Sequence, residues 1–265
     1  MTEYQHNTMI EVANLTIGYT DKKKKLVVKH QLNFKANQGE FICLLGKNGV
    51  GKSTLLKTLS KVIPKLNGTI LFDKTAIEKY SSKSFSKMLS VVLTERLPES
   101  NLSVFELVAL GRQPHTNWID SLSKVDFDKV MKALELTHTV HLKDKNIFEL
   151  SDGQLQKVLI SRALAQDTPI IIFDEPTAHL DIHHKIETFL LLKKLSKEAQ
   201  KTIIISTHEI HWAIEMADTI WLMTEQNCYF DTPENLKNQE RFQELFDSLL
   251  VTFDANSNQF KISST

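Results

Sequence analysis

A short glycine-rich segment has the residue types and spacing of a phosphate-binding loop. Its pattern is Gly-x-x-x-x-Gly-Lys-Ser, formed by Gly46, Lys47, Asn48, Gly49, Val50, Gly51, Lys52 and Ser53, with Thr54 next. Glycines let the backbone turn closely around a phosphate chain, and the helix that follows directs its partly positive N-terminus at the anion. The pattern therefore predicts that Lys52 reaches the β- and γ-phosphates of a nucleotide and that the Ser53 hydroxyl ligates Mg²⁺.

Two adjacent carboxylates follow an apolar run. Asp174 and Glu175 come directly after the apolar residues 170–173. Parallel strands present ligands at their carboxyl ends, so we expect Asp174 to hold Mg²⁺, directly or through water. Glu175 is then placed to activate the water that attacks the γ-phosphate. Taken alone, the pair is also compatible with two solvated acids at the start of a loop; the phosphate-binding loop favours a hydrolytic site.

Cysteine and histidine chemistry has little support. Cys43 and Cys228 each lie in an apolar segment and are too few for a disulfide framework or a zinc site, so we expect core thiols in a reducing compartment. His183 and His184 are adjacent and would project in different directions from a helix. The spacing of His208 and His211 is not that of a zinc-binding His-Glu-x-x-His motif. We assign these histidine groups to the surface or to packing, not to a metal site.

Composition disfavours nucleic acid as a partner. The chain has 32 Lys and Arg residues against 32 Asp and Glu residues, so no net positive charge attracts a phosphate backbone. Residues 22–25 form the only dense basic block, which we expect in a solvated turn, with contact to lipid headgroups as the alternative. No apolar run approaches the ~20 residues of a membrane-spanning helix, and residues 1–8 lack the apolar stretch of a signal peptide. We therefore expect a cytosolic protein that reaches a membrane only through a partner.

Five short runs predict the strands that would position the phosphate-binding and acidic residues. They are almost continuously apolar, which is typical of a parallel sheet covered on both faces. The runs are residues 41–45, 89–93, 170–173, 202–206 and 219–223. Helical patterns lie between them at residues 53–59, 182–195 and 209–216. This alternation predicts a three-layer α/β domain.

Other regions depart from that alternation. Residues 10–18, 27–34 and 68–72 predict extra strands, in a small antiparallel sheet. The middle of the chain is mainly helical, with patterns at residues 104–110, 127–136 and 155–165. We therefore expect one domain, with an α/β core from residues 1–93 and 167–265 and an inserted helical subdomain from 94–166. Near the C-terminus we expect a helix over residues 235–250 and a hairpin over 250–262.

The segment Leu-Ser-Asp-Gly-Gln at residues 150–154 looks like the Leu-Ser-Gly-Gly-Gln signature of the ABC ATPases, and the chain resembles that family over nearly its whole length. The resemblance implies a P-loop NTPase (RecA-like) parallel-sheet core, an N-terminal antiparallel β subdomain and an inserted α-helical subdomain. It also implies a head-to-tail homodimer in which Ser151, Gly153 and Gln154 close over the γ-phosphate of ATP held by the other copy.

Further roles follow from the resemblance alone. Tyr19 lies where the family has an aromatic residue that stacks on adenine, although an ordinary tyrosine at a strand end remains the alternative. Asp181 ends the segment at residues 178–181 that resembles the family's D-loop, and it would act across the dimer interface. His208 follows the strand at residues 202–206 and resembles the switch histidine that senses the γ-phosphate.

Two positions differ from the family pattern. Glu95 stands where members usually carry glutamine, and its carboxylate would ligate Mg²⁺ or orient water while adding negative charge near the phosphates. Asp152 replaces a glycine of the signature and brings a negative charge close to the expected γ-phosphate position. The sequence leaves open whether Glu95 tightens metal binding or slows the reaction.

The chain resembles one group of importers in particular. It carries a single phosphate-binding loop and no heptad tract, as in cassettes whose permeases are separate polypeptides. Residues 104–115 are similar to the corresponding segment of iron-siderophore, haem and cobalamin importer ATPases. The resemblance implies integral-membrane permease partners at the cytoplasmic face of the cell (inner) membrane, docking around residues 95–115, and indirectly a substrate-binding protein. The alternatives are a cytosolic ABC ATPase that regulates a soluble partner and an unrelated P-loop kinase.

Overall fold

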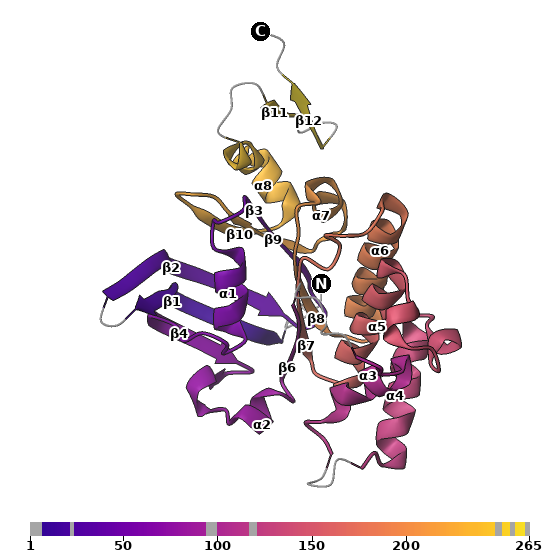
Figure 1. Cartoon of the computed structure of the whole chain (residues 1–265). Coiled ribbons are helices and arrows are strands. Elements are labelled where there is room, and N and C mark those ends of the chain that lie inside the picture. Colours follow the sequence, from indigo (N-terminus) through magenta and orange to yellow (C-terminus); the bar gives the residue numbers. More distant parts are fainter. Residues whose placement is uncertain are drawn as a thin grey trace, which may run out of the picture. The chain divides into compact units, whose positions relative to one another are not determined.

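The computed structural model describes residues 7–21, 24–93, 100–116, 121–246, 251–254 and 258–262. The chain divides into two compact units, which are treated separately below. The first consists of Met1–Ile77 with Leu192–Thr265, and the second of Glu78–Leu191. Figure 1 traces the elements of both units along the chain. Within the described ranges, no helix is both long enough and apolar enough to cross a bilayer.

The first unit contains the antiparallel sheet expected near the N-terminus, whose strands lie side by side in Figure 1. The strand order is β2-β1-β4-β5, with β1 (Thr8–Asp21), β2 (Lys24–Asn37), β4 (Asn67–Phe72) and β5 (Thr75–Ala76). From Leu32 onward β2 alternates buried and exposed residues, the period of a strand with one covered face. The predicted small antiparallel sheet is thereby confirmed.

A second set of strands in this unit has the order β10-β9-β3-β8, with β3 (Phe41–Gly46), β8 (Thr202–Ser206), β9 (Thr219–Met223) and β10 (Cys228–Asp231). β3 pairs in parallel with both β8 and β9, and every residue of β3 and β8 is buried. Burial on both faces explains why these strands are apolar without alternation. The antiparallel edge strand β10 was not predicted from the sequence.

The helices of the first unit are short. α1 (Lys52–Leu59) follows β3, and α7 (Ile210–Met216) follows β8. The helix predicted over residues 235–250 is wrong: α8 (Pro233–Asn238) ends early, Glu240 has a left-handed φ of 56°, and a 3₁₀ helix η5 (Arg241–Leu245) follows. A left-handed residue cannot continue an α-helix. The predicted terminal hairpin is confirmed as β11 (Val251–Asp254) paired with β12 (Gln259–Ile262).

The second unit contains a parallel pair of strands and most of the helices. β6 (Leu89–Val92) and β7 (Ile170–Asp174) pair with Val92 opposite Phe173. The helices are α2 (Ser82–Phe85), α3 (Val104–Ala109), α4 (Lys124–Leu136), α5 (Asp152–Ala165) and the start of α6 (Ile182–Glu198), with the 3₁₀ turns η1 (Ile77–Lys79), η2 (Leu110–Arg112), η3 (Val140–Leu142) and η4 (Ile147–Glu149). The helices expected at residues 104–110, 127–136 and 155–165 are confirmed.

A buried ion pair joins three helical elements of this unit. Arg112 Nε lies 2.9 Å from Asp126 Oδ1, and Arg112 donates a second hydrogen bond of 2.7 Å to the carbonyl of Ala165 at the end of α5. Asp126 also accepts hydrogen bonds from Ser123 at the start of α4. These bonds, foremost those from Ser123 and then those from Arg112, lower the pKa of Asp126 despite its burial. The pair fixes α4 and η2 to the end of α5.

Candidate functional site

The phosphate-binding loop runs from the end of β3 to the start of α1. Gly46 lies so close to β9 that an added Cβ would be 2.4 Å from the carbonyl oxygen of Met223. Gly51 has a left-handed φ of 113°, and a Cβ there would lie 2.6 Å from Val28 Cγ1. Both glycines are therefore required by the close approach of neighbouring strands. Gly49, by contrast, has open space around it.

Lys52 is turned into its own loop. Its side chain is buried, and the ammonium donates hydrogen bonds to the carbonyls of Gly46 at 2.7 Å and Lys47 at 3.1 Å. Among the described residues, no side chain caps the N-terminus of α1, whose N-cap is Gly51. The first amides of α1 and a desolvated ammonium therefore face one small volume, an arrangement that favours an anion.

The residues after Lys52 divide between solvent and packing. Ser53 is exposed and Thr54 is buried, with Thr54 Oγ1 3.0 Å from the hydroxyl of Tyr19. This bond fixes Tyr19 at the end of β1 beside α1, while 44% of the residue's surface stays exposed. An aromatic side chain next to the phosphate-binding helix is suited to stacking on a base.

His208 emerges at the same edge of the sheet as the loop. β3 and β8 are parallel, with Leu44 opposite Ser206, and the amide of Thr207 donates to the carbonyl of Leu44 at 3.1 Å. Gly46 and His208 each follow two residues after this aligned pair. Because carboxyl ends of parallel strands meet at one edge, the first unit brings together the loop, Tyr19 and the exposed His208.

The two acids lie in the second unit at the end of β7. Asp174 is the last residue of the strand and is buried. Glu175 is half-buried and has a left-handed φ of 50°. A non-glycine residue in this conformation is strained by about 1–3 kcal/mol, and such strain concentrates at functional sites. Glu95 lies outside the described residues.

The signature segment forms the start of α5. Ser151 Oγ accepts a hydrogen bond of 3.3 Å from the amide of Gln154, and Gln154 Oε1 accepts one of 3.2 Å from the amide of Ser151. This is a capping box. Asp152, which differs from the family pattern, is exposed, whereas Gly153 is buried. The same unit places Asp181 directly before α6, where it accepts two hydrogen bonds from His184.

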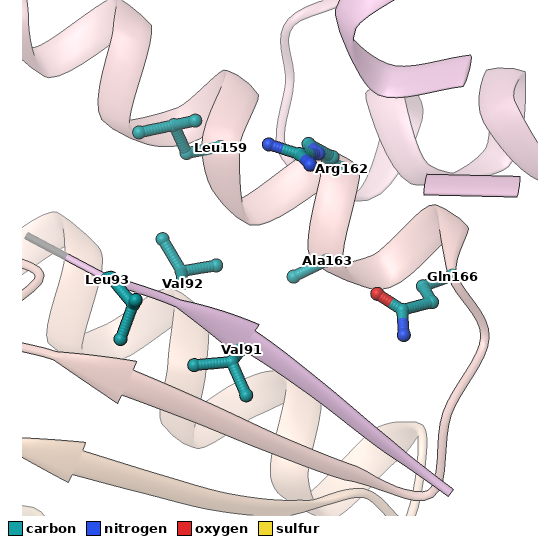
Figure 2. Close-up of a pocket in the computed structure, with 7 residues that line it drawn as sticks. All are labelled: Val91, Val92, Leu93, Leu159, Arg162, Ala163 and Gln166. Atoms are coloured by element: carbon teal, nitrogen blue, oxygen red, sulfur yellow. The ribbon is translucent and has the colours of Figure 1, made fainter. Parts of the chain in front are cut away.

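A cavity of about 210 Å³ lies between the end of β6 and α5 (Figure 2). Five of its seven lining residues are aliphatic and two are polar: Val91, Val92, Leu93, Leu159, Arg162, Ala163 and Gln166. Gln166 ties the end of α5 to β6 by donating to the carbonyls of Ser86 at 2.6 Å and Leu89 at 3.1 Å. Burial lowers the pKa of Arg162.

Sequence reasoning missed two residues near these segments. Lys29 is a buried lysine on β2 whose ammonium donates to the carbonyls of Thr224, at 2.6 Å, and Glu225. His184, assigned only to the surface or packing, contacts both Asp181 and Gly153. For Lys29, the only signal in the sequence is a lysine within a strand that also carries buried residues. For His184, the only signal is its position next to the segment that resembles the D-loop.

The residues expected around Mg²⁺ are of a suitable kind. Ser53 offers an exposed hydroxyl and Asp174 a carboxylate at a strand end, and Mg²⁺ takes hard oxygen ligands, usually few from the protein and the rest from phosphate and water. Within the described ranges, no group of three or more His, Cys, Asp or Glu side chains is gathered to hold a metal by itself. Neither cysteine offers a reactive thiolate, because burial raises both pKa values, that of half-buried Cys228 to about 11.

Comparisons with known proteins agree with this geometry. The family model described as ABC transporter matches residues 29–178. The petrobactin import ATP-binding protein FpuD of Bacillus anthracis is 32% identical over 89% of this chain and 86% of that protein. A solved metal-chelate type ABC transporter in an inward-facing conformation matches with a TM-score of 0.78 and 30% identity, over 91% of this chain and 89% of that one. The solved dimeric MJ0796 cassette matches with a TM-score of 0.73 and 25% identity, over 85% of this chain and 99% of that one.

Proposed function

The chain belongs to the ABC transporter family as an ATP-hydrolysing subunit, and from this premise we propose that it drives import of an iron complex (a siderophore or haem) or of cobalamin. ATP binding is supported by the α1 N-terminus, which no described side chain caps, and by the buried Lys52 ammonium that contacts the loop carbonyls. The observation that carries the cargo is the similarity to the petrobactin import ATP-binding protein and to the solved metal-chelate type transporter. The fold is the P-loop NTPase cassette of its solved relatives.

The proposed reaction uses groups that follow the ends of β3, β7 and β8. Backbone amides of the loop and the Lys52 ammonium neutralise the β- and γ-phosphates, which places most of the catalysis in positioning and electrostatics. Lys52 would exchange the loop carbonyls that it now contacts for phosphate oxygens. Glu175 accepts a proton from the attacking water, and His208 contacts the γ-phosphate. Tyr19 stacks on adenine.

Mg²⁺ would be held by Ser53 and Asp174, with Glu95 as a further oxygen ligand, and would supply charge neutralisation on the phosphates. The protein's own part is to present these oxygens to the metal. Titration of ATP binding with and without Mg²⁺ tests this assignment. Ser53→Ala is expected to weaken the Mg²⁺-dependent part of the affinity while leaving the Mg²⁺-independent part.

We propose further that two copies assemble head to tail, with Ser151, Gly153, Gln154 and Asp181 of each facing the nucleotide of the other. The support is a capped helix tip that carries small residues, together with the dimeric state described for the related MJ0796 cassette. In this proposal residues 1–93 and 167–265 bind the nucleotide, and residues 94–166 move with the partner proteins.

The proposed partners are integral-membrane permease subunits and, through them, a substrate-binding protein. The chain would sit peripherally at the cytoplasmic face of the membrane. The cavity between β6 and α5 supports permease docking near residues 95–115, because it is lined by aliphatic residues with an arginine and a glutamine and includes Leu93, which shortly precedes that segment in the chain. The name of the Bacillus anthracis relative supports a siderophore as cargo.

Uptake by reconstituted vesicles tests the cargo. Vesicles that contain the permease, this chain and ATP are supplied with a radiolabelled ferric siderophore, haem or cobalamin, and accumulation of one of them, absent with Lys52→Ala, is expected. The transporter names of the relatives disfavour a cytosolic regulator. That alternative would gain support if the chain sedimented with membranes to the same small extent whether or not the permease was present.

A further inference from the structure

His184 joins two segments that are separate in sequence. It is the third residue of α6, and its backbone amide donates a 2.9 Å hydrogen bond to Asp181 Oδ1. Its Nδ1 lies 2.8 Å from Asp181 Oδ2. A carboxylate only accepts hydrogen bonds, so Nδ1 is the donor. These bonds lower the pKa of Asp181, the backbone bond most, and hold its carboxylate in one orientation at the start of α6.

The same imidazole ring lies directly against the signature helix. A Cβ added to Gly153 would be 2.7 Å from His184 Cδ2 and 2.9 Å from His184 Cγ. Among the described residues, six glycines have a positive φ, and Gly153 is not one of these six. A side chain at this position would therefore force the ring of His184 to shift, although the backbone conformation of Gly153 would allow it.

A second link lies one turn farther along both helices. Lys157 Nζ is 2.8 Å from Glu187 Oε2, and this hydrogen bond is the main cause of the lowered pKa of Glu187. Lys157 follows Gly153 by four residues, and Glu187 follows His184 by three, so each link uses the same helix faces. The first turns of α5 and α6 are thus joined at two successive levels.

We propose that His184 is a positioning residue that fixes the Asp181 carboxylate to the tip of the signature helix, so that both reach the nucleotide of a second copy as one rigid piece. The inference rests on the proposed head-to-tail dimer, because only there do Asp181 and Gly153 act on the same nucleotide. The residue itself touches no substrate. Its effect would be on assembly of the closed dimer and on kcat.

Two substitutions separate the two contacts of His184. In His184→Asn the amide nitrogen can occupy the position of Nδ1 and keep the bond to Asp181, but the ring over Gly153 is lost. In His184→Phe the ring remains, but the donor is lost. We expect each to lower kcat about tenfold to a hundredfold, with KM for ATP and ATP affinity unchanged, because misplacement of a positioned group by about 1 Å has this effect. His183→Asn, on a neighbour with 76% of its side chain exposed, is the control; it removes the exposed contact of His183 with Glu187 Oε1 at 3.3 Å and leaves His184 in place.

A thermal double-mutant cycle tests the ring contact without reference to catalysis. Gly153→Ala is expected to lower the melting temperature in the His184 background, where the new methyl group meets the ring, and to lower it less in the His184→Asn background. Equal losses in both backgrounds would contradict the contact. A purely structural role for His184 would lower ATP affinity and melting temperature in step with kcat, and that result would overturn the proposal.

ATP-driven dimerisation of the purified chain distinguishes a failure of the role proposed for His184 from a failure of the proposed function. If the unmodified chain dimerises with ATP and Mg²⁺ while His184→Phe and His184→Asn dimerise and turn over normally, the positioning role is wrong and the proposed function stands. If the unmodified chain never dimerises with ATP and yet supports uptake in vesicles, the dimer geometry and the role of His184 are both overturned. The expected result is normal dimerisation in His183→Asn and weakened dimerisation in both His184 variants.

Discussion

Glu175, which follows the buried Asp174 at the end of β7, is the residue that we expect to be indispensable for hydrolysis. Glu175→Gln keeps the shape of the side chain and removes the proton acceptor. ATP binding should be retained while kcat falls about a hundredfold or more, the usual contribution of a general base. Binding measured by calorimetry and turnover measured by phosphate release check this. Glu198→Gln, on an exposed acid at the end of α6, is the control, and near-normal turnover of Glu175→Gln would assign the base to another group.

The buried Lys29 supports the phosphate-binding loop from behind. Its ammonium holds the carbonyls of Thr224 and Glu225, which follow the Met223 carbonyl that lies against Gly46. Lys29→Met leaves those acceptors without this donor and should cost about 1–3 kcal/mol of stability. We also expect weaker ATP binding, measured by calorimetry below the melting temperature. Lys35→Met, at an exposed position on the same strand, should change neither quantity.

The sequence predicts residues whose chemistry depends on near neighbours, and misses those whose partners are distant. The phosphate-binding loop is contained in nine residues, so its spacing alone indicates the turn and the helix start. Lys29 donates to a carbonyl 195 residues away, and no local pattern indicates that contact. His184 was assigned to the surface or packing, and its specific contacts depend on how α5 and α6 pack, which periodicity does not predict.

At the scale of elements, the signature helix is stabilised by the same residues that are proposed to act on ATP. Ser151→Ala removes one half of the capping box of α5 and should lower stability by about 1 kcal/mol. Ser103→Ala removes the equivalent serine from the capping box of α3 and should cost a similar amount. Only Ser151→Ala should also lower kcat. If the two variants had equal ATPase activity, capping of α5 would be the only role of Ser151.

The buried pair of Arg112 and Asp126 should make stability depend on pH. The folded pKa of Asp126 lies below its ordinary value of about 3.9, so its contribution is fully present above that pH and is lost as the pH falls through the folded pKa. Asp126→Asn should therefore be less stable at neutral pH and lose less on acidification. Denaturant unfolding at several pH values measures this, with the exposed Asp128→Asn as control. Parallel pH curves for Asp126→Asn and the unmodified chain would contradict the assignment.

The predictability of elements follows their burial. Strands buried on both faces, such as β3 and β8, are continuous apolar runs and were predicted to within one residue. β10 was missed because it is a half-buried edge strand of four residues with no strong pattern. The predicted helix over residues 235–250 has enough helical composition, but the left-handed turn at Glu240 interrupts it. Nothing in the type of that residue signals the turn.

At the scale of the whole molecule, ATP should control the oligomeric state. With ATP and Mg²⁺, Glu175→Gln should accumulate as a dimer, because closure is retained and hydrolysis is slowed. Lys52→Ala should remain monomeric under the same conditions, because the phosphates lose their ammonium. Light scattering coupled to gel filtration measures both. A Glu175→Gln chain that stays monomeric at saturating ATP would contradict the head-to-tail dimer.

The left-handed conformation of Glu175 also implies that the protein gives up some thermal stability in order to place a base at this position. Glycine adopts this conformation without the penalty of about 1–2 kcal/mol that a side chain incurs, although its freer unfolded chain offsets roughly 0.5–1 kcal/mol. Glu175→Gly should therefore melt at a higher temperature than Glu175→Ala, which loses the same side-chain interactions but keeps the backbone penalty, while both variants lose the base. If Glu175 is the base, the chain carries for hydrolysis a backbone penalty that a glycine would relieve.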